Sequence, residues 1–182
     1  MKKMKRLAAM LLALVMVLGM SITAFAGQTT NGVASKTDTA TVTIEGISGN
    51  ATVTLYQIAT GVYGDSGTGL IKYEYINGIT PLSDEPKSSE INKAHQEILA
   101  LNGNITAADT QTNINGTYTS KELSVGAYIA IISEATDDSV YNPVLVTVSY
   151  DKTGKLVSGN VNVTNGYIFG SSAVAKKTMP SI

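Results

Sequence analysis

The stretch ATVTIEGISGNATVTLYQIA, residues 40–59, alternates apolar and polar side chains in each of its halves. Valine, isoleucine and leucine take every second position, and threonine takes most of the positions between them. Successive side chains of a strand point to opposite faces, so the pattern predicts two strands, 40–46 and 51–59, each with one buried face. The glycines and asparagine of GISGN, residues 46–50, predict the turn between these strands.

Further strands are predicted along the rest of the chain. The hairpin turn YDKTGKL (150–156) separates two of them, because Asp, Lys and Gly suit a tight turn. Seven or eight strands at short spacing, with one helix between them, favour an all-β sandwich over a parallel α/β sheet. The remaining predicted strands are LIKYEYINGI (70–79), YTSKEL (118–123), GAYIAIIS (126–133), NPVLVTVSY (142–150), LVSGNVNV (156–163) and GSSAVAKK (170–177).

Residues 88–103 form the one predicted helix. Ser88 or Ser89 is expected to cap its N-terminus, Glu90 suits the positive end of the helix dipole, and Gly103 ends it. The expected apolar face follows helical spacing, and its largest members should pack across an edge or face of the sandwich. This face comprises Ile91, Ala94, Ile98, Leu99 and Asn102, of which Ile91, Ile98 and Leu99 should make the packing.

The N-terminus has the pattern of a secretory signal peptide. Four basic residues precede an apolar run, and Ala24-Phe25-Ala26 supplies the small-residue cleavage site. The run is short for a membrane span of about 20 residues, and a single N-terminal anchor is the alternative. The expected organisation is a signal peptide (1–26), a flexible segment (27–38), a β-sandwich domain (39–177) and the start of a linker to a following domain (178–182).

The composition after residue 26 narrows the class of protein. Nine lysines face 14 acidic residues, which gives a net charge of −5 and argues against a nucleic-acid partner. The chain contains no cysteine, so disulfides and lipid attachment through an N-terminal cysteine are excluded. Secreted eukaryotic domains often carry disulfides, so the absence of cysteine favours a bacterial exported protein. We expect no stable membrane insertion after the signal peptide is removed.

Three short patterns imitate catalytic signatures without completing a site. Asp65-Ser66-Gly67 matches half of an aspartic-protease dyad, but the second carboxylate motif is missing. Residues 151–154 match a phosphorylated-aspartate motif but also suit a turn. His95 is the only histidine, so neither a zinc site nor a convincing catalytic triad can be built around it. We therefore expect no enzyme, catalytic residue, metal or cofactor.

Three other stretches together resemble a known family. ELSVGAYIAII (122–132) resembles the Leu-x-x-Gly-x-Tyr stretch of collagen-adhesin (Cna) B-type domains, which have an Ig-like fold. VYNPVLVTVSY (140–150) and VTLYQIA (53–59) are similar to strands of the N-terminal domain of Gram-positive backbone pilins. With the signal peptide and the terminal VAKKTMPSI, the resemblance covers nearly all of the chain after residue 26, in the family's order.

The resemblance implies a subunit that is polymerised covalently outside the cell. In the family, a class C sortase holds one subunit as a thioester through an LPxTG-type signal, and a lysine of the next subunit attacks it. This lysine often lies in a Val-Tyr-Pro-Lys motif on the last strand, where the chain has Val174-Ala175-Lys176-Lys177. Lys177 takes the place of the motif lysine and Lys176 is the alternative. Two solvated lysines at an ordinary strand end are the remaining interpretation.

Domains of this family often contain an internal Lys–Asn isopeptide bond assisted by a buried acid. Ile132 stands where that acid is usual, Glu134 lies two residues further on, and Lys36 is a first-strand candidate. Lysines 176 and 177 occupy the place of the partner asparagine. The resemblance therefore implies no internal cross-link, with Lys36 and Glu134 as weak candidates.

The sequence thus favours the N-terminal domain of a major pilin on a Gram-positive cell wall. Its expected partners are a class C sortase, identical neighbouring subunits and host surface ligands. Since no LPxTG-like signal occurs, a fragment or a truncated product is expected. The alternative is an unpolymerised adhesin or carbohydrate-binding sandwich that recognises its ligand through loops 61–87 and 103–117.

Overall fold

The computed structural model describes residues 23–24, 33–83, 85–163 and 177–178, and among them it forms an all-β domain with one helix. This confirms the predicted fold class. The elements are β1 (Thr23–Ala24), β2 (Thr39–Ala40), β3 (Thr43–Tyr63), β4 (Leu70–Tyr75), α2 (Ser88–Leu101), β5 (Asp109–Thr119), β6 (Leu123–Ser124), β7 (Gly126–Ser133), β8 (Val140–Tyr141), β9 (Val144–Tyr150), β10 (Leu156–Ser158), β11 (Asn160–Asn162) and β12 (Lys177–Thr178).

The long strand β3 joins the two predicted strands of the opening stretch. The predicted reversal at GISGN is wrong, because both halves of β3 pair antiparallel with the same strand, β5. Gly46, Gly49 and Asn50 have positive φ angles, and the pairing with β5 shifts register around them. These residues therefore supply local irregularities that bend a continuous strand, which is a common use of such residues besides turns.

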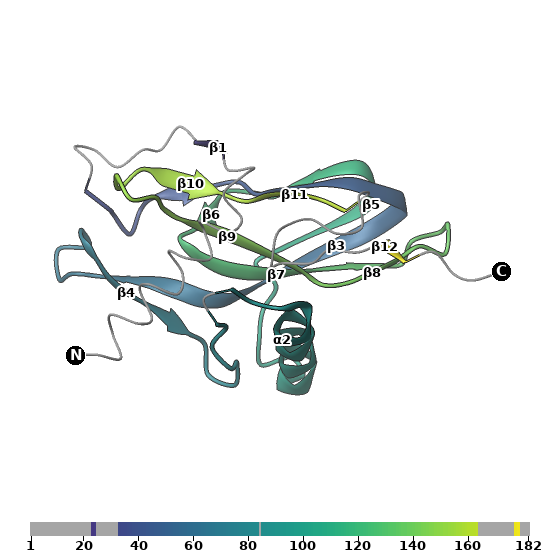
Figure 1. Cartoon of the computed structure of the whole chain (residues 1–182), viewed down its shortest axis with the longest axis horizontal. Helices are drawn as coiled ribbons and strands as arrows, with labels where there is room; N and C mark the ends of the chain where they lie inside the picture. The colour runs from purple at the N-terminus through teal and green to yellow at the C-terminus, as the bar shows by residue number, and fades with distance from the viewer. Residues whose placement is uncertain (1–22, 25–32, 84, 164–176, 179–182) are drawn as a thin grey trace.

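The main sheet is arranged around β3. Along one path the order is β1-β10-β9-β7-β3, while β4 and β5 also pair with β3 and β11 runs parallel to its first residues. Since β11 and β7 pair with successive parts of one strand, the bend in β3 lets the sheet curl over a shared interior (Figure 1). Short ladders β2–β6 and β12–β8 complete the described pairing.

A single core fills this curled sheet. The predicted alternation is confirmed in β3, where Val53 and Leu55 are fully buried between partly exposed neighbours. Every residue of β9 is buried, as expected for a strand covered on both faces. Five tyrosines also belong to the core, and these are Tyr73, Tyr118, Tyr128, Tyr141 and Tyr150.

The helix α2 lies against β7 and ends two residues before the predicted boundary, at Leu101 (Figure 1). Ile91, Ala94 and Ile98 are buried as predicted. Leu99 is 58% exposed, so its predicted packing role is wrong. A face centred on Ile91 and Ala94 turns Leu99 toward solvent, because each residue adds about 100° around the helix axis. Lys87, rather than Ser88 or Ser89, occupies the N-cap position.

Two predicted loops are partly strands. Strand β3 continues to Tyr63, so only residues 64–69 form the tip of the β3–β4 hairpin. Residues 109–117 belong to β5, whose many exposed Asn and Thr side chains concealed the strand pattern. The predicted strand 70–79 is confirmed over Leu70–Tyr75, and the hairpin turn at 150–156 is confirmed by the antiparallel β9–β10 pair.

The predicted terminal strand 170–177 lies mostly outside the described residues. Its last residue begins β12, which is described as Lys177–Thr178. Within the predicted flexible segment, Ser35 bridges to Thr68, and the Lys36 backbone N–H donates to the Gly67 carbonyl at 2.9 Å. The part of the predicted signal peptide that is described, β1, pairs with β10.

Candidate functional site

The short ladder between β8 and β12 places one predicted acceptor residue. The two strands run antiparallel, with Lys177 opposite Tyr141 and Thr178 opposite Val140. Both strands lie at the same end of the long axis of the molecule (Figure 1). Lys176, the alternative, lies outside the described residues. Tyr141 of the Tyr-Asn-Pro motif thus belongs to β8, the strand that pairs with the backbone of Lys177.

Tyr141 is the buried end of a polar network at this position. Its phenol oxygen accepts a hydrogen bond from the Ser48 backbone N–H at 2.9 Å and lies 3.0 Å from Ser48 Oγ. Ser48 Oγ in turn donates to Asp137 Oδ2 at 2.6 Å. A serine hydroxyl has one proton, so the phenol of Tyr141 must donate to Ser48 Oγ. The network therefore leads from Tyr141 through Ser48 to the carboxylate of Asp137, which is exposed.

The backbone around this network holds Asp137 against the bend in β3. The Thr136 backbone N–H and hydroxyl both donate to the Gly49 carbonyl, at 2.7 and 2.9 Å. The Ser139 backbone N–H donates to Asp137 Oδ1 at 3.0 Å. Gly49 has a φ angle of +79°, and a Cβ atom there would overlap the Asp137 carboxylate. A glycine is therefore required for the carboxylate to approach this closely.

We call the side chains of Ser48, Asp137 and Tyr141 the bend cluster. Sequence reasoning did not find it, because Ser48 lies 89 residues before Asp137 and no local pattern links them. The cluster combines an exposed carboxylate with two hydroxyl groups beside the strand that carries Lys177. Chemically, such a group can accept a proton or hold an ammonium group.

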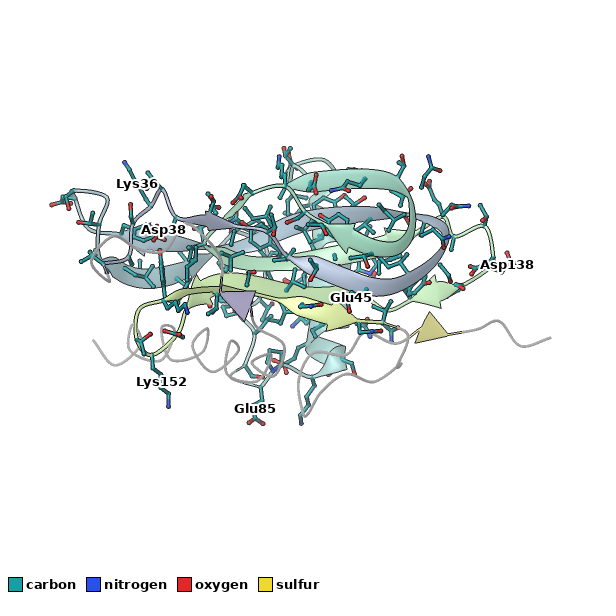
Figure 2. The ribbon with its side chains drawn as sticks, turned by 90° about the horizontal axis from the view of Figure 1, so that it is seen from above. Lys36, Asp38, Glu45, Glu85, Asp138 and Lys152 are labelled. Carbon is teal, nitrogen blue, oxygen red and sulfur yellow. The ribbon has the colours of Figure 1, made fainter. Side chains whose placement is uncertain are left out.

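The two weak candidates for an internal cross-link lie far apart. Lys36 lies against Gly67 in the hairpin tip at one end of the domain. Glu134 is exposed at the end of β7 and accepts a hydrogen bond from Thr52 Oγ1 at 2.8 Å. Asp138, four residues after Glu134 in the chain, lies at the opposite end of the long axis from Lys36 (Figure 2). Ile132 is buried, with 6% exposure.

A second polar cluster fastens the N-terminal segment. The Tyr150 hydroxyl donates to Asp38 Oδ2 at 2.7 Å and lies 2.9 Å from the Tyr63 hydroxyl. Burial, together with the hydrogen bonds to Tyr63 and Asp38, raises the pKa of the Tyr150 phenol far above its usual value. The Ser35 backbone N–H also donates to Asp38. These hydrogen bonds attach residues 35–38 to β3 and β9. The polar groups of the cluster are hydrogen-bonded to one another.

The other motifs found in the sequence do not form reactive sites. Asp65 and Ser66 lie in the hairpin tip, and Asp151 accepts hydrogen bonds from Thr153 and Lys155, which confirms its role in a turn. Burial lowers the pKa of His95, whose ring is partly covered.

Within the described residues, no group of three His, Cys, Asp or Glu side chains is placed to hold a metal ion. In that same part of the chain, no helix has the length and apolar character needed to cross a membrane.

The Leu-x-x-Gly-x-Tyr stretch has a structural explanation. Tyr128, near the start of β7, donates its hydroxyl proton to the Ser124 carbonyl at 2.6 Å. This arrangement is a tyrosine corner, in which a phenol bonds to backbone a few residues upstream. Together with the curled antiparallel sheet, it identifies an immunoglobulin-like domain.

Comparison with known proteins identifies the family. The model of the T6 antigen Ig-like domain family matches residues 37–177, and the chain belongs to this family. The trypsin-resistant surface T6 protein of Streptococcus pyogenes serotype M6 is 35% identical over 156 residues, which cover 86% of this chain. The aligned region is 29% of that relative, so the chain spans less than a third of its length.

A solved structure gives the same result. The T6 backbone pilin of serotype M6 Streptococcus pyogenes, a modular three-domain protein decorated with variable loops and extensions, aligns with a TM-score of 0.58 and 38% identity. The alignment covers 81% of this chain and 30% of the pilin chain. The predicted family resemblance and Ig-like fold are therefore confirmed.

Proposed function

We propose that this chain is the N-terminal domain of a covalently polymerised pilus subunit displayed on a Gram-positive cell surface. It acts as a substrate of a class C sortase and not as an enzyme. Lys177 provides the amine that joins it to the next identical subunit. The observation that carries this proposal is the family match over residues 37–177, which ends on Lys177 and is accompanied by 38% identity to a solved backbone pilin.

The position of Lys177 supports its role as acceptor. Strand β12 pairs with β8, so the backbone of this residue is fixed against the domain. Val140, which lies opposite Thr178 in the same ladder, is 59% exposed. An acceptor residue whose backbone is already paired loses less entropy when it is aligned with a thioester.

The signal peptide supports export of the chain. Cleavage after Ala26 removes residues 1–26, including β1, which pairs with β10. The surface T6 protein and the backbone pilin are the relatives that support a surface location.

The acceptor role is tested with purified residues 27–182, a class C sortase and a labelled LPxTG-type donor peptide. Lys177→Ala should abolish attachment of the label, and Lys176→Ala should leave it within about twofold. Intact-mass and peptide mass spectrometry identify the modified lysine. Attachment that survives Lys177→Ala but is lost in Lys176→Ala moves the role to Lys176, and attachment that survives the double substitution overturns the proposed site.

A further inference from the structure

The outer edge of β10 is covered by a strand that the proposed signal-peptide cleavage removes. Strand β10 pairs with β9 on one side and with β1 on the other, and these are its only strand partners in the part of the chain that the structure describes. Strand β1 lies within residues 1–26. All three residues of β10 are buried while β1 is in place. Cleavage after Ala26 therefore opens one edge of the main sheet.

The hydrogen bonds to β9 show which backbone groups of β10 face this edge. The Gly159 backbone N–H donates to the Thr147 carbonyl of β9 at 2.9 Å. The backbone groups of successive residues in a strand point to alternate sides, so those of Val157 also face β9. The N–H and C=O groups of Leu156 and Ser158 therefore face β1, and cleavage leaves them without a strand partner.

Strand β10 lacks the features that usually protect an open edge. Its residues, Leu156, Val157 and Ser158, include no charged side chain and no proline, and its pairing with β9 has no bulge. An unprotected edge is a template for a further strand. The pairing of Thr23 with Ser158 shows that an antiparallel strand fits there. The edge of the cleaved chain is thus suited to strand addition.

We propose that β10 pairs with β10 of a second copy of this chain once β1 has been removed. The strand is self-complementary in an antiparallel ladder that has Val157 on its two-fold axis. Leu156 then lies opposite Ser158 of the second copy, and each such pair exchanges the hydrogen bonds that β1 made before cleavage. The two Val157 residues form the non-hydrogen-bonded pair between them, in which side chains lie close together.

This inference rests on the proposed function, because it requires cleavage of the signal peptide and a fibre of identical subunits. Covalent bonds join the subunits of one fibre head to tail, whereas a two-fold contact uses the same surface on both partners. The β10 pairing therefore joins subunits of two fibres side by side. Each fibre repeats the edge in every subunit, so individually weak pairings act together. The edge thus provides lateral association of fibres.

Cysteine cross-linking of residues 27–182 tests the register, because the chain contains no cysteine of its own. Val157→Cys places two thiols on the two-fold axis, where the Cα atoms of a non-hydrogen-bonded pair are about 4.5 Å apart, a distance that a disulfide spans. Mild oxidation should convert most of this variant to a covalent dimer. Lys152→Cys is the matched control, because Lys152 is exposed in the β9–β10 turn, away from the axis. It should remain mostly monomeric.

A synthetic peptide of residues 20–26 tests whether the dimer uses the edge that β1 occupied. The peptide should compete with the Val157→Cys cross-link. N-methylation of Thr23 removes an N–H that faces Ser158 and should abolish competition. N-methylation of Ala24 should preserve competition, because that N–H faces away from β10. Since the three peptides act on the same protein, their comparison does not depend on the folding of a further variant.

Two substitutions of Ser158 separate backbone pairing from side-chain effects. Ser158→Pro removes an N–H that faces the open edge, whereas Ser158→Ala keeps it. Sedimentation of residues 27–182 should show that the unaltered chain and Ser158→Ala dimerise and that Ser158→Pro does not. Thermal denaturation verifies that each variant is folded.

The outcomes are distinguishable from failure of the proposed function, because none of these measurements uses a sortase or Lys177. A cross-link that forms equally in Val157→Cys and Lys152→Cys overturns the two-fold register. A dimer that persists in folded Ser158→Pro, or a cross-link that the peptide does not reduce, overturns pairing through this edge. An unaltered chain that binds the peptide but stays monomeric overturns the second copy as the occupant of the edge.

Discussion

Individual residues decide how closely strands approach in this domain. Gly126 lies at the start of β7, where the pairing with β3 shifts register between Gln57 and Ala59. A Cβ atom at this position would overlap the Ala59 carbonyl oxygen. Two residues later, Tyr128 forms the tyrosine corner, and burial raises the pKa of its phenol to about 12. The motif therefore combines a close backbone approach with a buried hydrogen bond.

Gly126→Ala should destabilise the domain. The added methyl group meets backbone rather than a flexible side chain, so we expect a loss of about 1–3 kcal/mol in the free energy of unfolding, as for overpacked cores. Urea denaturation measures this change. Gly159→Ala is the control, because a Cβ atom there meets Val146 Cβ at an ordinary 3.4 Å. Equal stability of the two variants would contradict the steric explanation.

At the scale of elements, carboxylates attach α2 to the loop that precedes it. Glu90 accepts hydrogen bonds from the Ser83 backbone N–H and hydroxyl, both at 2.9 Å, and from the Lys87 backbone N–H at 2.8 Å. Glu97 accepts from the Thr80 backbone N–H at 2.6 Å. The helix is thus held by its buried apolar face on β7 and by these bonds to the connecting loop.

Glu90 should make the stability of the domain depend on acid pH. Partial desolvation raises the pKa of Glu90, but hydrogen bonds from Lys87 and Ser83 outweigh it, so the folded-state pKa lies below the usual value. Its contribution is therefore present above the unfolded pKa of about 4.3 and is lost as pH falls through the folded pKa. Chemical denaturation at pH 7 and at pH 3 should detect this loss.

Glu90→Gln should lower the free energy of unfolding at pH 7 by about 1–2 kcal/mol, since it replaces hydrogen bonds to a charged group. The variant should also lose less stability than the unaltered chain between pH 7 and pH 3. Glu85→Gln is the matched control, because Glu85 is exposed in the same loop (Figure 2). A control that behaves like Glu90→Gln would show that the acid dependence reflects overall charge.

At the scale of the whole molecule, the long axis separates chemically different ends. Lys36 lies at one end, and Asp138, β8 and β12 lie at the other (Figures 1 and 2). Lys36 belongs to the first end, whereas Glu134 follows β7 toward the second. Two groups separated in this way do not form an isopeptide bond with each other.

The intact mass of purified residues 27–182 should equal the sum of the residues. An internal isopeptide bond would remove one ammonia, or one water if an acid were the partner. The expectation rests on the buried apolar Ile132 at the usual position of the acid and on the separation of Lys36 from Glu134. A mass lower by ammonia or water would contradict it, and Glu134→Gln would then identify whether that carboxylate takes part.

The sequence by itself determined the strands with strict alternation and the buried face of the helix. Val53 and Leu55 in β3, and Ile91, Ala94 and Ile98 in α2, follow local periodicities that burial imposes on any amphipathic element. The family motifs were also local, and they led to Lys177 as a candidate acceptor. The polar strand β5 was missed, because most of its residues are polar and exposed and therefore show no alternation of apolar and polar side chains.

Only the tertiary structure decided what happens at GISGN and which residues meet at the bend. The same glycines and asparagine suit a reversal or a bulged strand, and the choice depends on whether β5 is available to pair with both halves of β3. Likewise, Ser48, Asp137 and Tyr141 become neighbours only through strand register, which depends on pairing between distant segments. Local sequence encodes which face of an element is apolar, but contacts across 89 residues are set by how the complete sheet closes over its core.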